Sequence, residues 1–122
     1  DTQYGPLYNM TWVDDPDIHI TIPAPGFPCR IVAFFNGEGW GETYSEMGIA
    51  LGVKFVVDGQ PIDPSIRRLG KGPTTGSYTR ACYATQMAVD DDGADAINIK
   101  IQLYGYYAVF FKRNMVVLLW PQ

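Results

Sequence analysis

The sequence is poor in the residues that most metal and catalytic sites use. Among its 122 residues there are two cysteines, Cys29 and Cys82, and one histidine, His19. Two cysteines do not complete a zinc site, and His19 has no second histidine with which to share a metal. No serine lies in a nucleophile-elbow setting, and no pair of carboxylates lies in an apolar stretch that would raise a pKa. We therefore expect no metal, no cofactor and no enzymatic activity.

Positive charge and long hydrophobic runs are also scarce. The net charge is −4, and the densest basic group is Arg67-Arg68 with Lys71, so we expect no nucleic-acid binding. No apolar run approaches the ~20 residues of a membrane helix, so we expect no membrane insertion. The length indicates a single domain over residues 1–122. Within it, residues 1–12 are a candidate docking arm or linker that carries exposed apolar residues, namely Tyr4, Leu7, Tyr8 and Trp12.

What the sequence does have is apolar residues at every second position. The clearest case is Ile97 to Leu103, and shorter cases are Ile18 to Ile22 and Val53 to Val57. This period is typical of half-buried strands, and no segment has apolar residues at helical spacing over three turns. The 13 glycines and 9 prolines fall mostly between the runs. The pattern predicts an all-β, antiparallel two-sheet sandwich, jelly-roll-like, with about eight strands.

Two acid-rich stretches raise the question of a metal loop or a catalytic pair. In Asp90 to Asp95 four aspartates surround Gly93, but no glutamate closes the loop as calcium loops of the EF-hand type require. Aspartate and glycine also tolerate the backbone geometry of tight turns. We interpret this stretch as a turn that precedes the strand starting at Ile97. We give Asp14-Asp15-Pro16-Asp17 the same interpretation.

The stretch from Asn36 to Glu46 is the best candidate for binding. We interpret it as a polar, glycine-rich connection between strands, and it contains Trp40 and Tyr44. Aromatic rings flanked by amides and carboxylates are typical of sugar-binding surfaces, because the rings stack and the polar groups take the hydroxyls. The candidate ligand-binding residues are Trp40, Tyr44, Glu42 and Asn36. The alternative is that Trp40 folds back and closes one end of the sandwich.

The cysteines allow two interpretations. Cys29 and Cys82 could form a disulfide between two strands, or both could be free and buried as small apolar residues. Both lie inside runs that have the pattern of core strands, so we favour free, buried thiols.

From Gly52 onward the order of features resembles the β-sandwich domains on the virions of tailed bacteriophages. The residues that carry the resemblance are the strand and V-D-G turn of Gly52 to Ile62, the R-A-x-Y-A-T core in Ser77 to Thr85, the strand Ile97 to Tyr104, the strand Tyr107 to Phe111, and the closing strand Arg113 to Trp120. They cover a little over half of the chain. The acidic stretch Asp90 to Asp95 is longer and more charged than the corresponding turn of that family.

The resemblance implies a non-enzymatic virion structural protein. The leading expectation is the head domain of a phage tail fibre or spike, which attaches to a host surface glycan or protein. Alternatives are a capsid decoration (cement) protein that stabilises the phage shell and a carbohydrate-binding module of a secreted protein. The first two place the chain on the surface of the extracellular particle. The implied partners are other virion proteins and copies of itself, as a homotrimer or another symmetric assembly.

Overall fold

The structure is almost entirely β. The computed structural model describes the chain except for residues 1–2, 8–10, 43–50, 70–77 and 106. The described residues contain no helix of the length and hydrophobicity that crossing a membrane would require. They form strands and one short 3-10 helix: β1 (Tyr4–Leu7), β2 (Val13–Ile22), β3 (Cys29–Glu42), β4 (Leu51–Val57), β5 (Gln60–Pro61), η2 (Asp63–Ser65), β6 (Arg67–Leu69), β7 (Tyr78–Asp91), β8 (Ile97–Gly105) and β9 (Ala108–Pro121).

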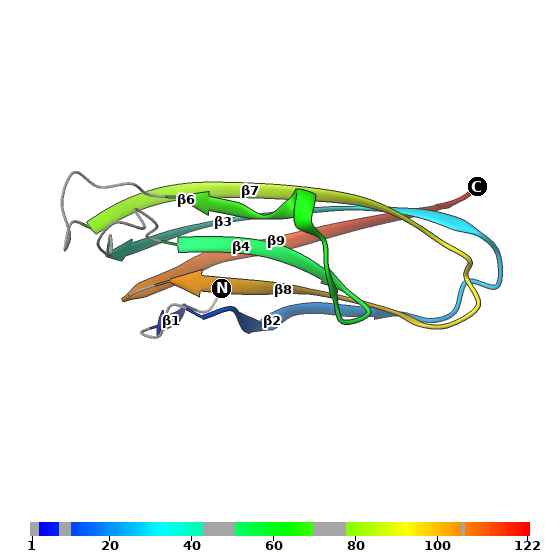
Figure 1. Cartoon of the computed structure of the whole chain (residues 1–122), viewed down its shortest axis with the longest axis horizontal. Coiled ribbons are helices and arrows are strands. Elements are labelled where there is room, and N and C mark those ends of the chain that lie inside the picture. Colours follow the sequence, from blue (N-terminus) through cyan, green and yellow to red (C-terminus); the bar gives the residue numbers. More distant parts are fainter. Residues whose placement is uncertain (1–2, 8–10, 43–50, 70–77, 106) are drawn as a thin grey trace.

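The strands form two antiparallel sheets that pack face to face (Figure 1). Sheet A has the order β1-β9-β3-β7, and sheet B has the order β2-β8-β4-β5, with β6 also paired to β4. The pairs β1–β9, β2–β8, β3–β7 and β4–β6 are nested, so the chain runs as one long hairpin that alternates between the sheets. This is the strand order of a jelly roll. The predicted jelly-roll-like sandwich is therefore confirmed.

The core follows the alternation of the sequence. In β8 the side chains of Ile97, Ile99, Ile101 and Leu103 are fully buried, and the residues between them face solvent or are half-buried. Ile20 and Ile22 of β2 lie opposite Ile99 and Ile97 and share their face of sheet B, because directly opposed residues of an antiparallel pair point the same way. The strands predicted over these two segments are confirmed.

The long strand β3 corrects one expectation. Asn36 to Glu46 was interpreted as a glycine-rich connection, whereas β3 continues through it to Glu42. Gly37, Gly39 and Gly41 all face inward and are buried. A Cβ atom at Gly39 would lie 2.8 Å from the Val109 carbonyl oxygen and 3.3 Å from Leu51 Cδ2. Glycine is needed here because the core is too crowded for a side chain, and not because the chain turns.

The two acid-rich stretches differ. The turn predicted from Asp90 onward is confirmed over Asp92 to Ala96, whereas Asp90 and Asp91 belong to β7. The turn lies beside the β2–β3 connection, where the Gly26 amide donates to the Gly93 carbonyl at 2.8 Å (Figure 1). Asp14 to Asp17 is not a turn. It lies within β2, where the register with β8 shifts between Asp14 and His19.

The irregular part of β2 places an acid in the core. Asp15 is 1% exposed, and its Oδ1 accepts a hydrogen bond of 2.6 Å from Arg113 of β9. Asp17, at the edge, takes a second bond of 2.8 Å from the same guanidinium. The ion pair joins sheet A to sheet B across the side of the sandwich where β2 and β9 border it. A buried charge needs such a partner, because removal from water is costly.

Part of the stretch that was expected to be an arm or linker belongs to the sandwich. Tyr4–Leu7 forms β1 at the edge of sheet A, with Tyr4 opposite Phe110 and Leu7 opposite Ala108. Trp12 packs on Tyr104 with ring centroids 5.3 Å apart, and the Lys54 ammonium lies 4.3 Å from the Trp12 ring centroid. Tyr8 lies outside the described residues.

Candidate functional site

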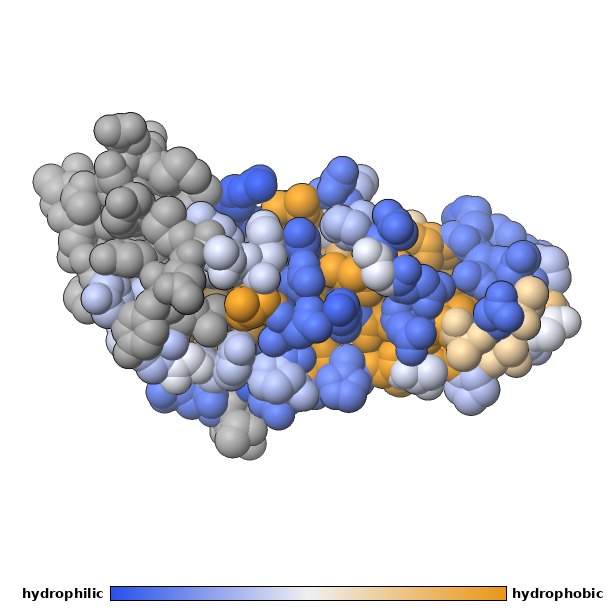
Figure 2. Space-filling model, turned by 60° about the horizontal axis from the view of Figure 1, so that its bottom comes forward, coloured by the Kyte–Doolittle hydropathy of each residue, from blue (hydrophilic) through white to orange (hydrophobic). Residues whose placement is uncertain are grey.

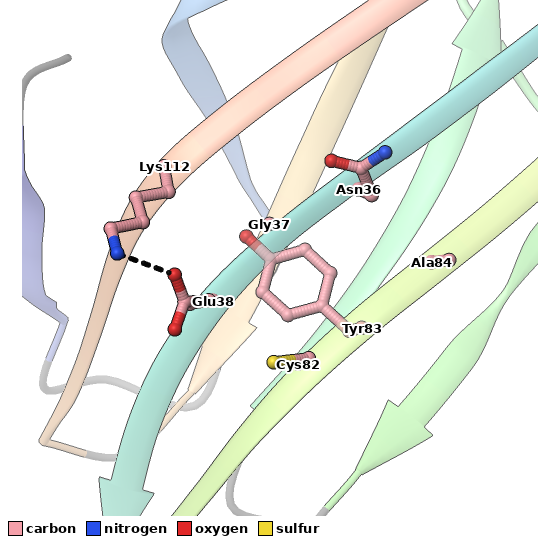
Figure 3. Close-up of a pocket in the computed structure, with 7 residues that line it drawn as sticks. All are labelled: Asn36, Gly37, Glu38, Cys82, Tyr83, Ala84 and Lys112. Atoms are coloured by element: carbon pink, nitrogen blue, oxygen red, sulfur yellow. Dashed lines mark ion pairs between the residues drawn. The ribbon is translucent and has the colours of Figure 1, made fainter.

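The outer face of sheet A carries a hollow of about 510 Å³ (Figure 3). Three neighbouring strands of the sheet line it: β3 with Asn36, Gly37 and Glu38, β7 with Cys82, Tyr83 and Ala84, and β9 with Lys112. Asn36 lies opposite Ala84, Gly37 opposite Tyr83, and Glu38 opposite Cys82. The volume lies within the range of small-molecule sites, roughly 300–1,000 Å³.

The floor of the hollow is formed by the backbone of Gly37, and the buried Tyr83 ring packs beneath it. The Tyr83 ring reaches from β7 across Gly37, so that a Cβ atom at position 37 would lie 2.5 Å from the Tyr83 hydroxyl oxygen (Figure 3). The ring also packs on Phe35 and Phe110, with centroid distances of 5.7 and 6.2 Å. An aromatic ring that covers a strand glycine in this way restores packing that the glycine would otherwise leave out.

The Tyr83 hydroxyl is itself unusual. The residue is 4% exposed, and within the described part of the chain the hydroxyl has no hydrogen-bond partner. Burial raises the pKa of the Tyr83 phenol well above its usual range; the positive charge of Arg113 opposes the shift and the negative charge of Asp15 adds to it. The phenol is therefore neutral at physiological pH and stiffens the floor through packing.

A β-bulge places the ammonium group of Lys112 at the hollow. Glu38 lies opposite Phe111 and Asn36 opposite Asn114, so Lys112 and Arg113 together oppose Gly37 alone. Lys112 takes the left-handed backbone conformation, with φ of 53°. Bulges commonly turn a side chain in a new direction. Here Arg113 enters the core, while the Lys112 ammonium reaches Glu38 Oε2 at 3.1 Å (Figure 3).

The polar groups around the hollow form two pairs. Lys112 and Glu38 make an ion pair, and the Asn114 side-chain amide donates to Asn36 Oδ1 at 2.6 Å. The Lys112 side chain is 69% exposed, and ion pairs of this kind contribute only about 0–1 kcal/mol. A polar ligand can therefore replace or bridge these contacts at small cost. The hollow offers a donor, an acceptor and an amide around a floor of glycine, alanine and tyrosine.

The residues predicted to bind a ligand are only partly brought together. Asn36 lines the hollow, and Trp40 is on the same outer face of β3, half-buried, opposite Arg80 and Val109. Glu42 ends β3, and Tyr44 lies outside the described residues. The alternative in which Trp40 closes one end of the sandwich stays a prediction.

Sequence reasoning missed Glu38, Lys112 and Cys82. Glu38 was within the stretch considered, and its place two residues after Asn36 puts both on one face once the stretch is known to be a strand. Lys112 and Cys82 come from β9 and β7, which are distant in the sequence. Nothing local in the sequence marks their contact with β3.

The two cysteines are free thiols. Cys29 faces the core at one end of β3, opposite Asp91, whereas Cys82 lies opposite Glu38 near the other end. Cys29 is buried, as expected, but Cys82 is exposed at the hollow, contrary to expectation. Cys82 lies on the outward-facing side of β7. Its exposure follows from the alternation of side chains along the strand, and the apolar character of the surrounding run did not predict it.

Among the described residues, no three histidine, cysteine, aspartate or glutamate side chains lie close enough together to hold a metal ion. Comparisons with protein-family models, with curated proteins and with solved structures found no match for this chain. The resemblance to phage virion domains therefore stays a prediction, and the geometry of the hollow is the basis for a function.

Proposed function

We propose that this chain is a non-enzymatic attachment domain that binds a surface carbohydrate in the hollow on sheet A, as the head of a phage fibre or spike. The observation that carries the binding proposal is the set of groups around the hollow. An ammonium from β9 and a carboxylate and a carboxamide from β3 lie around a floor of glycine, alanine and tyrosine. The place on a virion is supported by the sequence resemblance alone.

The chemistry of the hollow suits a sugar better than a purely anionic or purely apolar ligand. A sugar hydroxyl donates and accepts at once, so one hydroxyl can accept from Lys112 and donate to Glu38, which already lie 3.1 Å apart. Asn36 offers both a donor and an acceptor. The apolar side of a sugar ring can rest on Gly37 and Ala84. An anion would meet Glu38, and an apolar ligand would bury the ion pair without compensation.

Glycan-array binding by the chain tests the proposal. We expect binding that falls at least tenfold in Glu38→Gln and in Asn36→Ala, because each hydrogen bond to a charged or polar ligand group contributes about 1–3 kcal/mol. Gln86→Ala is the matched control, since Gln86 is exposed on the same strand face outside this hollow, and it should bind as the parent does.

Cys82 gives a second readout that does not depend on a particular array. A thiol reagent should modify exposed Cys82 and spare buried Cys29, and a bound sugar should slow that modification. Binding that survives both substitutions, or a sugar that binds without protecting Cys82, would place the ligand elsewhere. Failure to bind any sugar would contradict the proposal.

A further inference from the structure

The side of the sandwich where β2 and β9 meet is unusually apolar. Figure 2, which turns the lower edge of Figure 1 toward the viewer, shows a band of hydrophobic residues between hydrophilic ones. On β9 every residue from Met115 to Trp120 is apolar. Val116, Leu118 and Trp120 on the outer face are 52%, 46% and 44% exposed. Ile20 of β2 is 40% exposed, and Ile18 and Ile22 beside it on the strand are partly buried.

Strand β9 also has a free hydrogen-bonding edge over this segment. On one side it pairs with β3 from end to end, and on the other β1 covers only the part from Ala108 to Phe110. Beyond Phe110, no described strand pairs with that second side. The part of β9 without a described neighbour on that side therefore includes the whole apolar run from Met115 to Trp120.

The direction of the free backbone groups can be worked out. The Gln122 amide donates to the Pro28 carbonyl at 3.0 Å, so residue 122 points its backbone groups toward β3. Because these directions alternate along a strand, Trp120, Leu118 and Val116 also bond toward β3. The amides and carbonyls of Met115, Val117 and Leu119 therefore point to the free edge. Pro121, which has no amide, falls on that same edge, the position where a strand tolerates proline.

Two other edges of the sheets, those of β2 and β7, are protected. Strand β2 carries Pro16, a shifted register and two partly exposed aspartates. Strand β7 is flanked by η2, whose Ser65 carbonyl accepts a hydrogen bond from the Thr85 hydroxyl, and its exposed face carries Gln86 and Asp90. Proline, charge and coverage are the usual means of blocking edge-to-edge pairing. The edge of β9 from Met115 to Trp120 has none of them.

We infer that this edge pairs with the same edge of a second copy of the chain, as an antiparallel β9–β9 contact about a two-fold axis at Leu118. The occupant must be an extended, uncharged strand with a free edge, and the chain itself supplies one. Residues 114–122 carry no charged side chain, so two copies meet without like-charge contacts. An isologous contact of this kind closes on itself.

The position of the two-fold axis at Leu118 follows from the residues that are paired at the two ends of the segment. It places Val117 opposite Leu119 of the partner subunit, so that both pairs exchange backbone hydrogen bonds. The Met115 amide then donates to the carbonyl of the partner's Pro121, which needs no donor in return. A register centred one residue earlier would extend the pairing to Arg113, where Asp15 and Asp17 of β2 already bind the guanidinium.

The contact would also cover the exposed side chains. On the outer face, Val116 meets the partner's Trp120 and the two Leu118 side chains meet each other. On the inner face, Val117 and the partner's Leu119 lie toward Ile20. The two-fold axis stands perpendicular to the joined sheets, so both hollows face the same side. Two sites on one face would bind a multivalent surface more tightly than one site does.

Light scattering during size-exclusion chromatography of the whole chain tests the contact. We expect a particle of twice the 13.6 kDa chain mass. Leu118→Lys places two ammonium groups against each other at the axis and should weaken association at least about tenfold. Phe34→Lys is the matched control: Phe34 is 40% exposed on the same face, one strand away from the edge, and this variant should stay dimeric.

Charge complementation tests the register itself. Leu118→Lys and Leu118→Glu should each be monomeric, and an equal mixture of the two should regain the dimer, because only a two-fold axis at position 118 brings the opposite charges together. Circular dichroism of each variant checks that the fold is kept. In the parent, hydrogen exchange should be slow at the amides of residues 117 and 119, and in the monomeric variants exchange at the same amides should be fast. The amides of residues 116 and 118 should exchange slowly in both, because they bond to β3.

Several results would overturn the inference. A parent that stays monomeric at every attainable concentration has no such contact. The homotrimer that the phage resemblance implies would also contradict it, because antiparallel pairing of one edge gives two-fold symmetry. Dissociation by Phe34→Lys with Leu118→Lys still dimeric would place the interface on the face of the sheet. An equal mixture of the Leu118→Lys and Leu118→Glu variants that stays monomeric would refute the register.

Discussion

The two acid-rich stretches look alike in the sequence and do different things in the fold. In the stretch from Asp90 to Asp95 the carboxylates face solvent or cap the turn: Asp91 Oδ1 and Asp92 Oδ1 accept from the Gly93 and Ala94 amides at 2.7 and 2.9 Å. In the stretch from Asp14 to Asp17 one carboxylate is buried against Arg113, 98 residues away in the chain. The difference is a distant partner. The local composition predicts a turn in both stretches. They differ in the fold because β2 pairs with β8 and lies beside β9, which brings Asp15 against Arg113.

The largest expected effect comes from removing the buried acid. Asp15→Ala should lower the free energy of unfolding by about 3–5 kcal/mol, because it leaves Arg113 buried with a weaker partner. Asp92→Ala, in the other acidic stretch, should lower it by only about 0.5–1.5 kcal/mol, because it removes one exposed hydrogen bond to the Ala94 amide. Urea denaturation at neutral pH measures both.

A double replacement sharpens the same comparison. Asp15→Leu combined with Arg113→Met should recover most of the stability lost in Asp15→Ala, since well-packed apolar groups often replace a buried ion pair at no cost. A loss below about 1 kcal/mol in Asp15→Ala would mean that Asp17 alone satisfies Arg113.

In the acidic turn the important residue is the glycine. Gly93 has φ of 76°, and a Cβ atom there would overlap the Phe27 carbonyl group. Gly93→Ala should therefore cost about 1–3 kcal/mol from backbone strain, plus the cost of moving the β2–β3 connection. Gly59→Ala is the control, because Gly59 has a similar φ of 80° with nothing within 4 Å of the added atom. Thermal denaturation should show a larger loss for Gly93→Ala, and equal losses would mean that the connection yields freely.

The smallest effect at neutral pH is expected at Tyr83, which lies near the buried ion pair. Its folded-state pKa is raised above the usual value near 10, so its contribution to stability is complete below pH 10 and declines as the pH rises further. The decline should approach about 1.4 kcal/mol per pH unit. Tyr83→Phe should be at least as stable as the parent at pH 7, because it removes a buried hydroxyl that has no partner among the described residues, and it should lose less stability above pH 10. Urea titrations at both pH values check this, and parallel alkaline losses in the two proteins would contradict the burial of the hydroxyl.

The sequence predicted the strands better than the site. Apolar and polar residues alternate without exception from Ile97 to Leu103, so the sequence predicted which side chains of this strand are buried. The glycines at 37, 39 and 41 were misinterpreted, because a glycine that relieves crowding and a glycine that permits a turn look the same in a sequence. Asn36 was identified as a candidate, but Glu38 and Lys112 required knowledge that β3 continues and that β9 bulges opposite Gly37.

By itself, the sequence determined the all-β class and the side of each regular strand that faces the core, because a period of two permits no other buried arrangement. The tertiary structure alone decided which acid is buried, where Lys112 meets Glu38, and which strand edge has no neighbour among the described residues. These depend on contacts between residues far apart in the chain. Such contacts are set by the nested pairing of whole strands, and no local pattern of side chains encodes them.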